Sequence, residues 1–166
     1  MDSAAVQTIF RALNRARVRY LLVGGLAVVA HGYVRMTADV DLIVDLKEKN
    51  LLRALEVFRK LGYRPRVPVS IEQFADSRLR SLWVRKRNMK VFSLFSDRYA
   101  MTEVDLFVKA PFPFAKAFSR RRRLEVVPGV RASIAGYKDL LFLKRKAGRP
   151  QDLQDIRALQ SLGREK

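Results

Sequence analysis

The sequence predicts a single α/β domain in which helices flank a mixed β-sheet. Its 166 residues are the ordinary length of one domain. Segments with the apolar spacing of helices are interspersed with short segments in which apolar and polar residues alternate, as they do in half-buried strands. Two pairs of strand-like segments are joined by short turns, and such hairpins favour a mixed sheet over an all-parallel one.

Six segments have the apolar spacing of helices. Ser3 is a candidate N-cap for the first, and Gly32, Gly62 and Gly148 are positioned to end the helices that precede them. Pro150 suits the first turn of the last helix, where a missing backbone N–H costs nothing. The expected helices cover residues 3–16, 26–31, 47–61, a short segment ending at 118, 136–147 and 150–162.

Seven further segments have the pattern of strands. Residues 87–90 are expected to form a hairpin turn between two of them, and Pro128-Gly129 a turn between two others. Gly24-Gly25 follows the first strand directly, at a strand-to-helix turn. The expected strands cover residues 19–23, 39–45, 82–87, 90–96, 101–108, 124–127 and 130–132.

The composition excludes several kinds of site. The chain has no Cys, which rules out disulfides, thiolate zinc sites and cysteine nucleophiles, and its one His argues against His-rich metal sites. The longest apolar run, residues 21–30, is half the length of about 20 residues that a membrane-spanning helix needs. The first residues also lack the pattern of a secretory signal. We therefore expect a cytoplasmic protein without a membrane partner.

The chain is strongly basic, and the charge is unevenly distributed. Its 34 Lys and Arg against 16 Asp and Glu give a formal net charge of +18. Residues 1–45 carry a net charge of +1, residues 46–105 carry +7 and residues 106–166 carry +10. Such a field attracts polyanions, of which nucleic acid is the first candidate, ahead of nucleotide phosphates and acidic membranes. The alternative is a solvated basic surface without such a partner.

Two aspartates on the strand at residues 39–45 suggest a metal site. Because side chains alternate along a strand, Val40 and Leu42 share a buried face, whereas Asp39 and Asp41 share the opposite one. Carboxylates so close together repel each other, and a divalent cation relieves the repulsion. Mg²⁺ prefers a few carboxylates together with phosphate oxygens and water. The pair therefore predicts a Mg²⁺ platform completed by a phosphate ligand.

A second strand repeats this alternation and adds a third carboxylate. Val104 and Leu106 face one way, and Asp105 faces the other. If the two strands are neighbours, Asp105 lies beside Asp39 and Asp41, and the three carboxylates can hold two Mg²⁺ ions, as enzymes of phosphoryl displacement do. The alternative is that all three are ordinary solvent-facing acids.

The Gly24-Gly25 turn is a candidate phosphate-binding site. Glycines at such a turn let backbone N–H groups approach a phosphate closely. The chain has neither a P-loop motif nor the glycine pattern of dinucleotide-binding proteins.

These motifs together resemble the signature of the DNA polymerase β-like nucleotidyltransferase superfamily. Within it, the chain is most similar to the small nucleotidyltransferases of the AbiEii and MenT type, which occur as toxins of type IV toxin–antitoxin systems. A Lys followed by an Arg-x-x-Asp-x-x-Asp pattern closes many of these chains. The matching residues are Gly24-Gly25, His31-Gly32, Arg35, Thr37, Asp39, Asp41, Asp105, Lys144, Arg149, Asp152 and Asp155.

The resemblance implies transfer of a nucleoside monophosphate from a nucleoside triphosphate, such as ATP, to an acceptor hydroxyl. Asp39 and Asp41 would hold the metal that grips the triphosphate, and Asp105 would share the second metal and help to deprotonate the acceptor. Residues 1–166 would form one nucleotidyltransferase domain, with the catalytic sheet in residues 1–109 and a basic part with two helices in residues 110–166.

The resemblance also implies which residues bind the nucleotide. Gly24 and Gly25 would bring N–H groups to its phosphates, and Lys144 would contact the triphosphate or, alternatively, be a solvated surface residue. The other positions of this set are expected either to bind the nucleotide or to order the residues that do. They are Arg35 and Thr37, which precede the first aspartate of the motif, and Asp155, which with Asp152 could pair with Lys144 or Arg149.

A run of four arginines, Arg120, Arg121, Arg122 and Arg123, predicts an RNA-binding surface. So few acids cannot neutralise all four, and guanidinium groups suit phosphate contacts. Together with the basic residues of 85–90, the run could form a cradle for RNA. By resemblance the acceptor would be a tRNA 3′ end and a partner antitoxin protein could exist. The open alternatives are a protein acceptor, a small aminoglycoside-type acceptor, which the positive charge disfavours, and a non-catalytic nucleic-acid-binding module.

Overall fold

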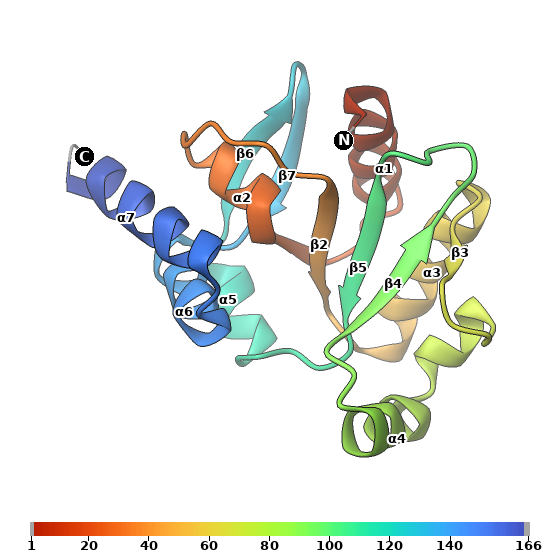
Figure 1. Cartoon of the computed structure of the whole chain (residues 1–166). Helices are drawn as coiled ribbons and strands as arrows, with labels where there is room; N and C mark the ends of the chain where they lie inside the picture. Colours follow the sequence, from red (N-terminus) through yellow and green to blue (C-terminus); the bar gives the residue numbers. More distant parts are fainter. Residues whose placement is uncertain (1, 165–166) are drawn as a thin grey trace.

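The computed structural model describes residues 2–164, and these contain one mixed sheet of seven strands (Figure 1). The strand order is β3-β4-β5-β2-β1-β7-β6. Strands β2 and β5 run parallel, as do β1 and β7, whereas the remaining neighbours are antiparallel. The strands are β1 (Tyr20–Val23), β2 (Asp39–Val44), β3 (Arg64–Pro65), β4 (Val91–Phe95), β5 (Glu103–Phe107), β6 (Arg122–Val127) and β7 (Val130–Ile134). The expected mixed sheet is therefore confirmed.

The helices follow the predicted order with two additions, at residues 71–75 and 77–87. Asp2, not Ser3, caps the first helix, because the Asp2 side chain accepts a hydrogen bond from the backbone N–H of Ala4. Among residues 2–164, no helix has the length and apolar character needed to cross a membrane. The helices are α1 (Ser3–Arg15), α2 (Gly24–Ala30), α3 (Glu48–Lys60), the 3₁₀-helix η1 (Ile71–Ala75), α4 (Ser77–Arg87), α5 (Phe114–Ser119), α6 (Tyr137–Ala147) and α7 (Pro150–Arg164).

The prediction of a strand over residues 82–87 is wrong, because these residues form the second half of helix α4. The Asp76 side chain caps this helix by accepting hydrogen bonds from the N–H groups of Arg78 and Leu79. Asn88 ends it in the left-handed conformation, with a φ of 48°. The segment predicted as a hairpin is therefore a helix followed by strand β4. The strand that pairs with β4 is β3, and not residues 82–87.

The two faces of the sheet are covered to different extents. One face packs on α1, α3, η1 and α4, and it buries alternate residues such as Phe92, Leu94, Val104 and Leu106 completely or almost so. The other face is covered by α5 and α6 only around β1, where Leu21 and Val23 are buried. Over β4 and β5 the side chains of this second face remain half-buried. The sheet thus has an open half-face, next to the first residues of β2 and β5.

Candidate active site

The predicted carboxylates meet on the open half-face of the sheet. Strands β2 and β5 are parallel neighbours, and their register pairs Asp41 with Asp105 and Asp39 with Glu103. Val40, Leu42, Val104 and Leu106 point into the core, as the alternation predicts. The structure therefore places Asp39, Asp41 and Asp105 on one face at the start of two adjacent strands.

Electrostatic repulsion links these three carboxylates. Burial raises the pKa of Asp41 to about 6, and the charges of Asp105 and Asp39 add to the rise, whereas Lys144 and Arg149 oppose it. Burial also raises the pKa of Asp105, the charges of Asp39 and Glu103 add to this, and a hydrogen bond from Ser93 opposes it. Each effect favours a cation that would neutralise the cluster.

Gly24 lies directly against the carboxylate of Asp41. Its φ is +69°, and a Cβ built at this position would lie 1.8 Å from the Asp41 Oδ2 atom. Gly24 follows β1 and begins α2, as predicted, and its neighbour Val23 is the register partner of Asp41. The glycine is thus needed for conformation and for space, because any side chain would displace the carboxylate.

Gly25 has a second close approach, from the loop that precedes β2. A Cβ at Gly25 would lie 2.5 Å from Thr37 Oγ1 and 2.6 Å from Arg35 Nη2. The side chains of Arg35 and Thr37 therefore fold back over the glycine turn, while Val34, which precedes Arg35, and Met36, which lies between the two, are exposed. Gly25, Arg35 and Thr37, which belong to the same sequence motif, therefore lie around one turn.

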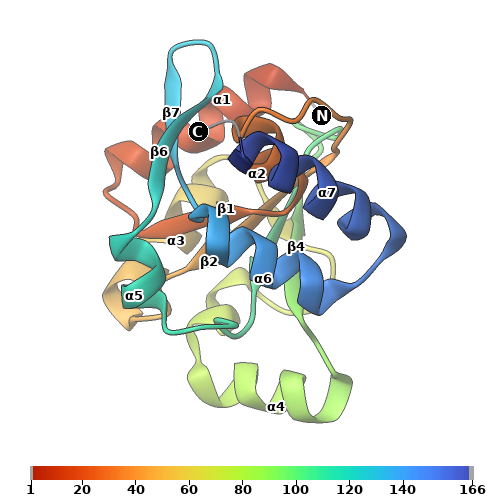
Figure 2. The same cartoon turned by 90° about the vertical axis from the view of Figure 1, so that its left-hand side faces the viewer.

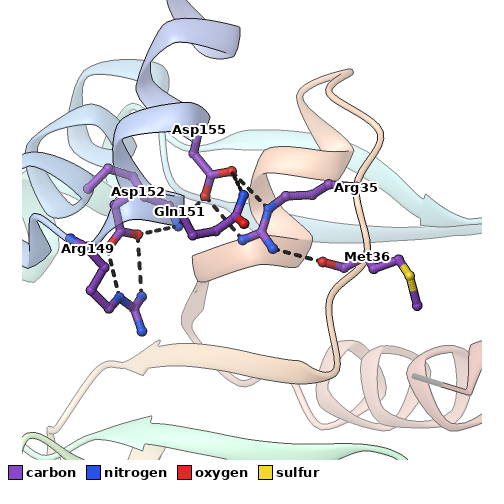
Figure 3. A network of polar contacts seen from close by, with 7 residues as sticks. Arg35, Met36, Arg149, Gln151, Asp152 and Asp155 are labelled. Carbon is purple, nitrogen blue, oxygen red and sulfur yellow. Dashed lines mark hydrogen bonds and ion pairs between the residues drawn. The ribbon is translucent and has the colours of Figure 1, made fainter.

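A buried network of charges joins this loop to helices α6 and α7 (Figure 3). Lys144 Nζ lies 2.9 Å from Asp152 Oδ1 and 2.7 Å from Asp155 Oδ2, and all three side chains are buried. Arg35 forms an ion pair with Asp155, with its Nε atom 2.9 Å from Asp155 Oδ1, and its Nη2 atom donates to Asp155 Oδ2 at 3.1 Å. Arg35 Nη1 donates to the carbonyl of Met36 at 2.8 Å. Asp155 therefore connects Lys144 of α6 with the loop before Asp39.

Arg149 completes the network at its solvent side. Its Nε donates to Asp152 Oδ2 at 2.8 Å, and its side chain remains mostly exposed. Burial alone would raise the pKa of Asp152, but hydrogen bonds from Arg149 and Lys144 outweigh it and hold this pKa at about 2. Of the alternatives for Lys144, the solvated surface residue is excluded by its burial, and both aspartates pair with it.

The donor set of the carboxylates suits Mg²⁺, although it is incomplete by itself. Within residues 2–164, no group of three or more acidic or His side chains is arranged to hold a metal ion. Asp39, Asp41 and Asp105 offer hard oxygen donors and mutual repulsion that a divalent cation would relieve. The chemistry of the set fits a metal whose other ligands come from a bound phosphate and water.

The four consecutive arginines differ in their surroundings. Arg120 makes a two-pronged ion pair with buried Asp139. Arg121 donates to the Phe118 carbonyl at 2.8 Å and stacks over the Phe118 ring. Arg122 and Arg123 are exposed on β6, and no ion pair within residues 2–164 involves them. Helix α4 with Arg85 and Arg87 lies at the opposite end of the molecule in both views, so the expected single cradle is not formed (Figures 1 and 2).

Sequence reasoning missed two polar side chains on the open half-face. Ser93 is the register partner of Asp105 on β4, and Arg66, which directly follows β3, lowers the pKa of Asp105 by its charge. Phe95 lies two residues beyond Ser93 on the same face. The alternation of β4 was visible in the sequence, but its neighbour in the sheet was not. His31 has the expected packing role, with Nε2 3.1 Å from the Ala135 carbonyl oxygen.

Comparisons with known proteins agree with this geometry. Residues 4–164 match the family model described as nucleotidyltransferase of unknown function (DUF6036). No curated protein matches the sequence. The fold is similar to the lincosamide antibiotic adenylyltransferase LnuA in its lincomycin-bound crystal structure, with a TM-score of 0.66, 15% identity and 98% coverage of each chain.

Two further solved structures share the fold. ANT(2″)-Ia in complex with adenylyl-2″-tobramycin has a TM-score of 0.62 and 14% identity, over 98% of this chain and 90% of that one. A Thermotoga maritima protein described as a nucleotidyltransferase has a TM-score of 0.58 and 15% identity, over 95% of this chain and 91% of that one. At these identities the likeness concerns the fold.

Proposed function

The chain belongs to the DUF6036 family of nucleotidyltransferases, and from that premise we propose that Asp39, Asp41 and Asp105 catalyse transfer of a nucleoside monophosphate from an NTP to the hydroxyl of an RNA acceptor. One observation carries the assignment of the site. The register partners Asp41 and Asp105 lie beside the Gly24 turn, where the Asp41 carboxylate fills the space that a side chain would occupy. The carboxylates and the backbone of the glycine turn therefore lie next to each other.

Each residue has a role that its surroundings support. Asp39 and Asp41 would hold Mg²⁺, with Asp105 shared between two ions, and the metal would neutralise charge on the triphosphate. Gly24 and Gly25 would direct backbone N–H groups to the phosphates. Arg149, which is exposed and influences the charge of Asp41, would contact the triphosphate directly.

In this proposal Lys144 and Asp155 do not contact the nucleotide directly, in contrast to what the family resemblance implies for Lys144. Because Lys144 is buried between two aspartates, its charge acts on the nucleotide through the field it creates and through Arg149. Asp155 is completely buried, so it positions Lys144 and Arg35 and does not itself touch the nucleotide. Arg35 and Thr37 would hold the loop that leads to Asp39.

The reaction would be an in-line displacement at the α-phosphorus. The acceptor hydroxyl oxygen forms a bond to the α-phosphorus, the bond from that phosphorus to its bridging oxygen breaks, and pyrophosphate leaves with the electron pair. The hydroxyl proton passes to Asp105, whose pKa is raised by burial. Positioning and charge neutralisation supply most of the catalysis.

The net charge of +18 supports RNA as the acceptor, because an anionic strand is attracted to such a field. A tRNA 3′ end and a toxin role, with a cognate antitoxin, extend this proposal on the strength of the motif's resemblance to the AbiEii and MenT type. The second candidate is a small hydroxyl-bearing molecule, because two of the similar folds belong to antibiotic adenylyltransferases. The charge disfavours cationic antibiotics among such molecules.

The deciding experiment is incubation with each α-labelled NTP, Mg²⁺ and an acceptor pool. Total RNA, total protein and a panel of aminoglycosides and lincosamides serve as separate pools, and Asp41→Asn is the matched control. Label on RNA that depends on Asp41 supports the proposal. Label on protein or antibiotic alone overturns the acceptor, and no Asp41-dependent label anywhere overturns the catalytic assignment. Induced expression of wild type and Asp41→Asn tests the toxin role by growth.

A further inference from the structure

Two rows of side chains cross the open half-face from the catalytic aspartates to the edge of the sheet. The register of β4 with β5 and β5 with β2 aligns Ser93, Asp105 and Asp41 in one row. The backbone N–H of Arg66 donates to the Ser93 carbonyl, which places Arg66 at the outer end of that row. The neighbouring row runs from Asp39 and Glu103 over Phe95 to Arg64.

The outer end of both rows is basic and accessible. Arg64 and Arg66 expose 59% and 54% of their side chains. Their guanidinium carbons lie 4.6 and 5.2 Å from the centroid of the half-buried Phe95 ring. Arg64 pairs with Asp97 through one nitrogen, and Arg66 pairs with Glu103 through two. Since a guanidinium has five N–H donors, both retain donors for a further anion.

Cationic groups therefore flank the carboxylates on two opposite sides. Lys144 of α6 and Arg149, which lies between α6 and α7, influence Asp41, whereas Arg66, directly after β3, influences Asp105. In Figure 1, α6 and α7 lie on one side of β2 while β4 and β3 lie on the other. An in-line displacement needs the attacking and leaving oxygens on opposite sides of the phosphorus. With the triphosphate on the Gly24 side, the acceptor must approach over β5 and β4.

We propose that the half-face formed by Arg64, Arg66 and Phe95 is the acceptor subsite, and that it binds the 3′ end of a single-stranded RNA. The terminal hydroxyl lies at Asp105, the preceding phosphate contacts Arg66 and Arg64, and Phe95 supports a sugar or base. Neighbouring strands are about 4.8 Å apart, so the two-strand separation of Arg66 and Asp105 is on the scale of one nucleotide unit. This inference rests on the proposed function and names the surface that selects its acceptor.

The test compares variants with equal loss of charge. Arg64→Gln/Arg66→Gln removes the proposed contacts, Arg85→Gln/Arg87→Gln removes two exposed charges from the distant helix α4, and Arg64→Lys/Arg66→Lys retains the charge. The probe is an unstructured RNA oligonucleotide with a 5′ fluorophore and a free 3′ hydroxyl, titrated at several salt concentrations. Because the two arginines contact one and the same phosphate, the first variant should lose about 0.7 in salt slope and about 5-fold in affinity near 0.1 M salt.

The expected result is a flattened slope in the Arg64/Arg66 glutamine variant alone, with the lysine variant close to wild type. ATP binding with Mg²⁺, followed by thermal shift, should be unchanged in all three variants, which also verifies their folding. Equal losses in the α4 variant and the Arg64/Arg66 variant overturn the subsite. Absence of any RNA binding by a wild-type protein that binds ATP also overturns it. Loss of ATP binding and transfer in the wild type would instead refute the proposed function.

Discussion

Asp41 and Asp105 are register partners on two parallel strands, although they lie far apart in the sequence. Burial and the charge of Asp105 raise the pKa of Asp41, and the charges of Lys144 and Arg149 oppose this rise only in part. In the ligand-free protein the carboxylates of this site repel one another, and a ligand that brings positive charge reduces this repulsion.

The first prediction concerns the cost of this repulsion. Asp41 has a folded-state pKa of about 6 against an ordinary value of 3.8, so its ionised form destabilises the folded protein above about pH 6. Asp41→Asn should therefore stabilise the metal-free protein at neutral pH, by on the order of 2–3 kcal/mol. The gain should shrink as the pH falls and vanish below the unfolded pKa. Denaturant unfolding in a chelating buffer at several pH values measures it.

Asp39→Asn is the matched control, because it removes one neighbouring charge and leaves Asp41 in place. It should give a smaller gain in stability with the same direction of pH dependence. Both variants should lose nucleotidyl transfer. An Asp41→Asn protein less stable than the wild type at neutral pH would contradict this account.

The second prediction separates binding from chemistry at Asp105. Because Asp105 lies on the acceptor side and is the proposed base, Asp105→Asn should lower turnover by a factor of 100 or more, about the contribution of general base catalysis. NTP affinity should change little, since in the proposed function Gly24, Gly25 and Arg149 would contact the triphosphate elsewhere. Single-turnover transfer and equilibrium NTP binding are the measurements. Lost affinity with retained turnover at saturation would assign Asp105 to the nucleotide instead.

The third prediction tests the close approach at Gly24. Gly24→Ala combines a left-handed φ of +69° with a Cβ that collides with the Asp41 carboxylate. Gly129→Ala has the same kind of strain, with a φ of +73°, but no atom lies within 4 Å of its Cβ. The Gly129 variant should lose only about 1–2 kcal/mol and remain active. The Gly24 variant should lose more and be inactive, and equal effects in thermal unfolding and activity would refute the steric argument.

Much of this fold was predictable because its signals are local. Asp39 to Val44 and Glu103 to Phe107 alternate cleanly, and glycine stop signals delimit the helices. The strand prediction for residues 82–87 was wrong because Trp83 and Val84 favour strands when only a short window is considered. The helix is specified by its cap Asp76 and by the spacing of Leu79 to Leu82 and Trp83, and a window that begins at residue 82 leaves out Asp76 and Leu79.

The parts of the site that sequence could not predict depend on strand order and burial. Which strand lies beside β5 decides whether Ser93 and Arg66 reach Asp105, and no local pattern contains that information. Lys144 looks in sequence like a basic residue on an amphipathic helix. Its burial follows from the packing of α7 on α6, which brings Asp152 and Asp155 to its ammonium group.

The fourth prediction concerns Asp155 as a positioning residue. Asp155→Asn leaves Lys144 and Arg35 with less compensation in a buried network, which should cost about 3 kcal/mol or more. Asp97→Asn is the comparison, because its pair with Arg64 is exposed and such pairs contribute about 0–1 kcal/mol. Urea unfolding measures both. If Asp155 acts through the loop before Asp39, the KM for NTP should rise in the variant that still folds, with a smaller change in kcat.

The last prediction divides the four consecutive arginines into two functional pairs of equal charge. Arg120→Gln/Arg121→Gln removes the partner of buried Asp139 and the contacts with Phe118, so it should lower the Tm by several degrees. Arg122→Gln/Arg123→Gln removes exposed side chains of β6 and should leave the Tm unchanged. If this strand is a second contact for the RNA backbone, only the latter variant should flatten the salt dependence of RNA binding, by up to about 1.4 in slope. Thermal unfolding and RNA titration of the two proteins, side by side, measure both effects. An unchanged slope in the Arg122/Arg123 variant would identify these side chains as a solvated surface and leave RNA binding to the half-face around Arg64 and Arg66.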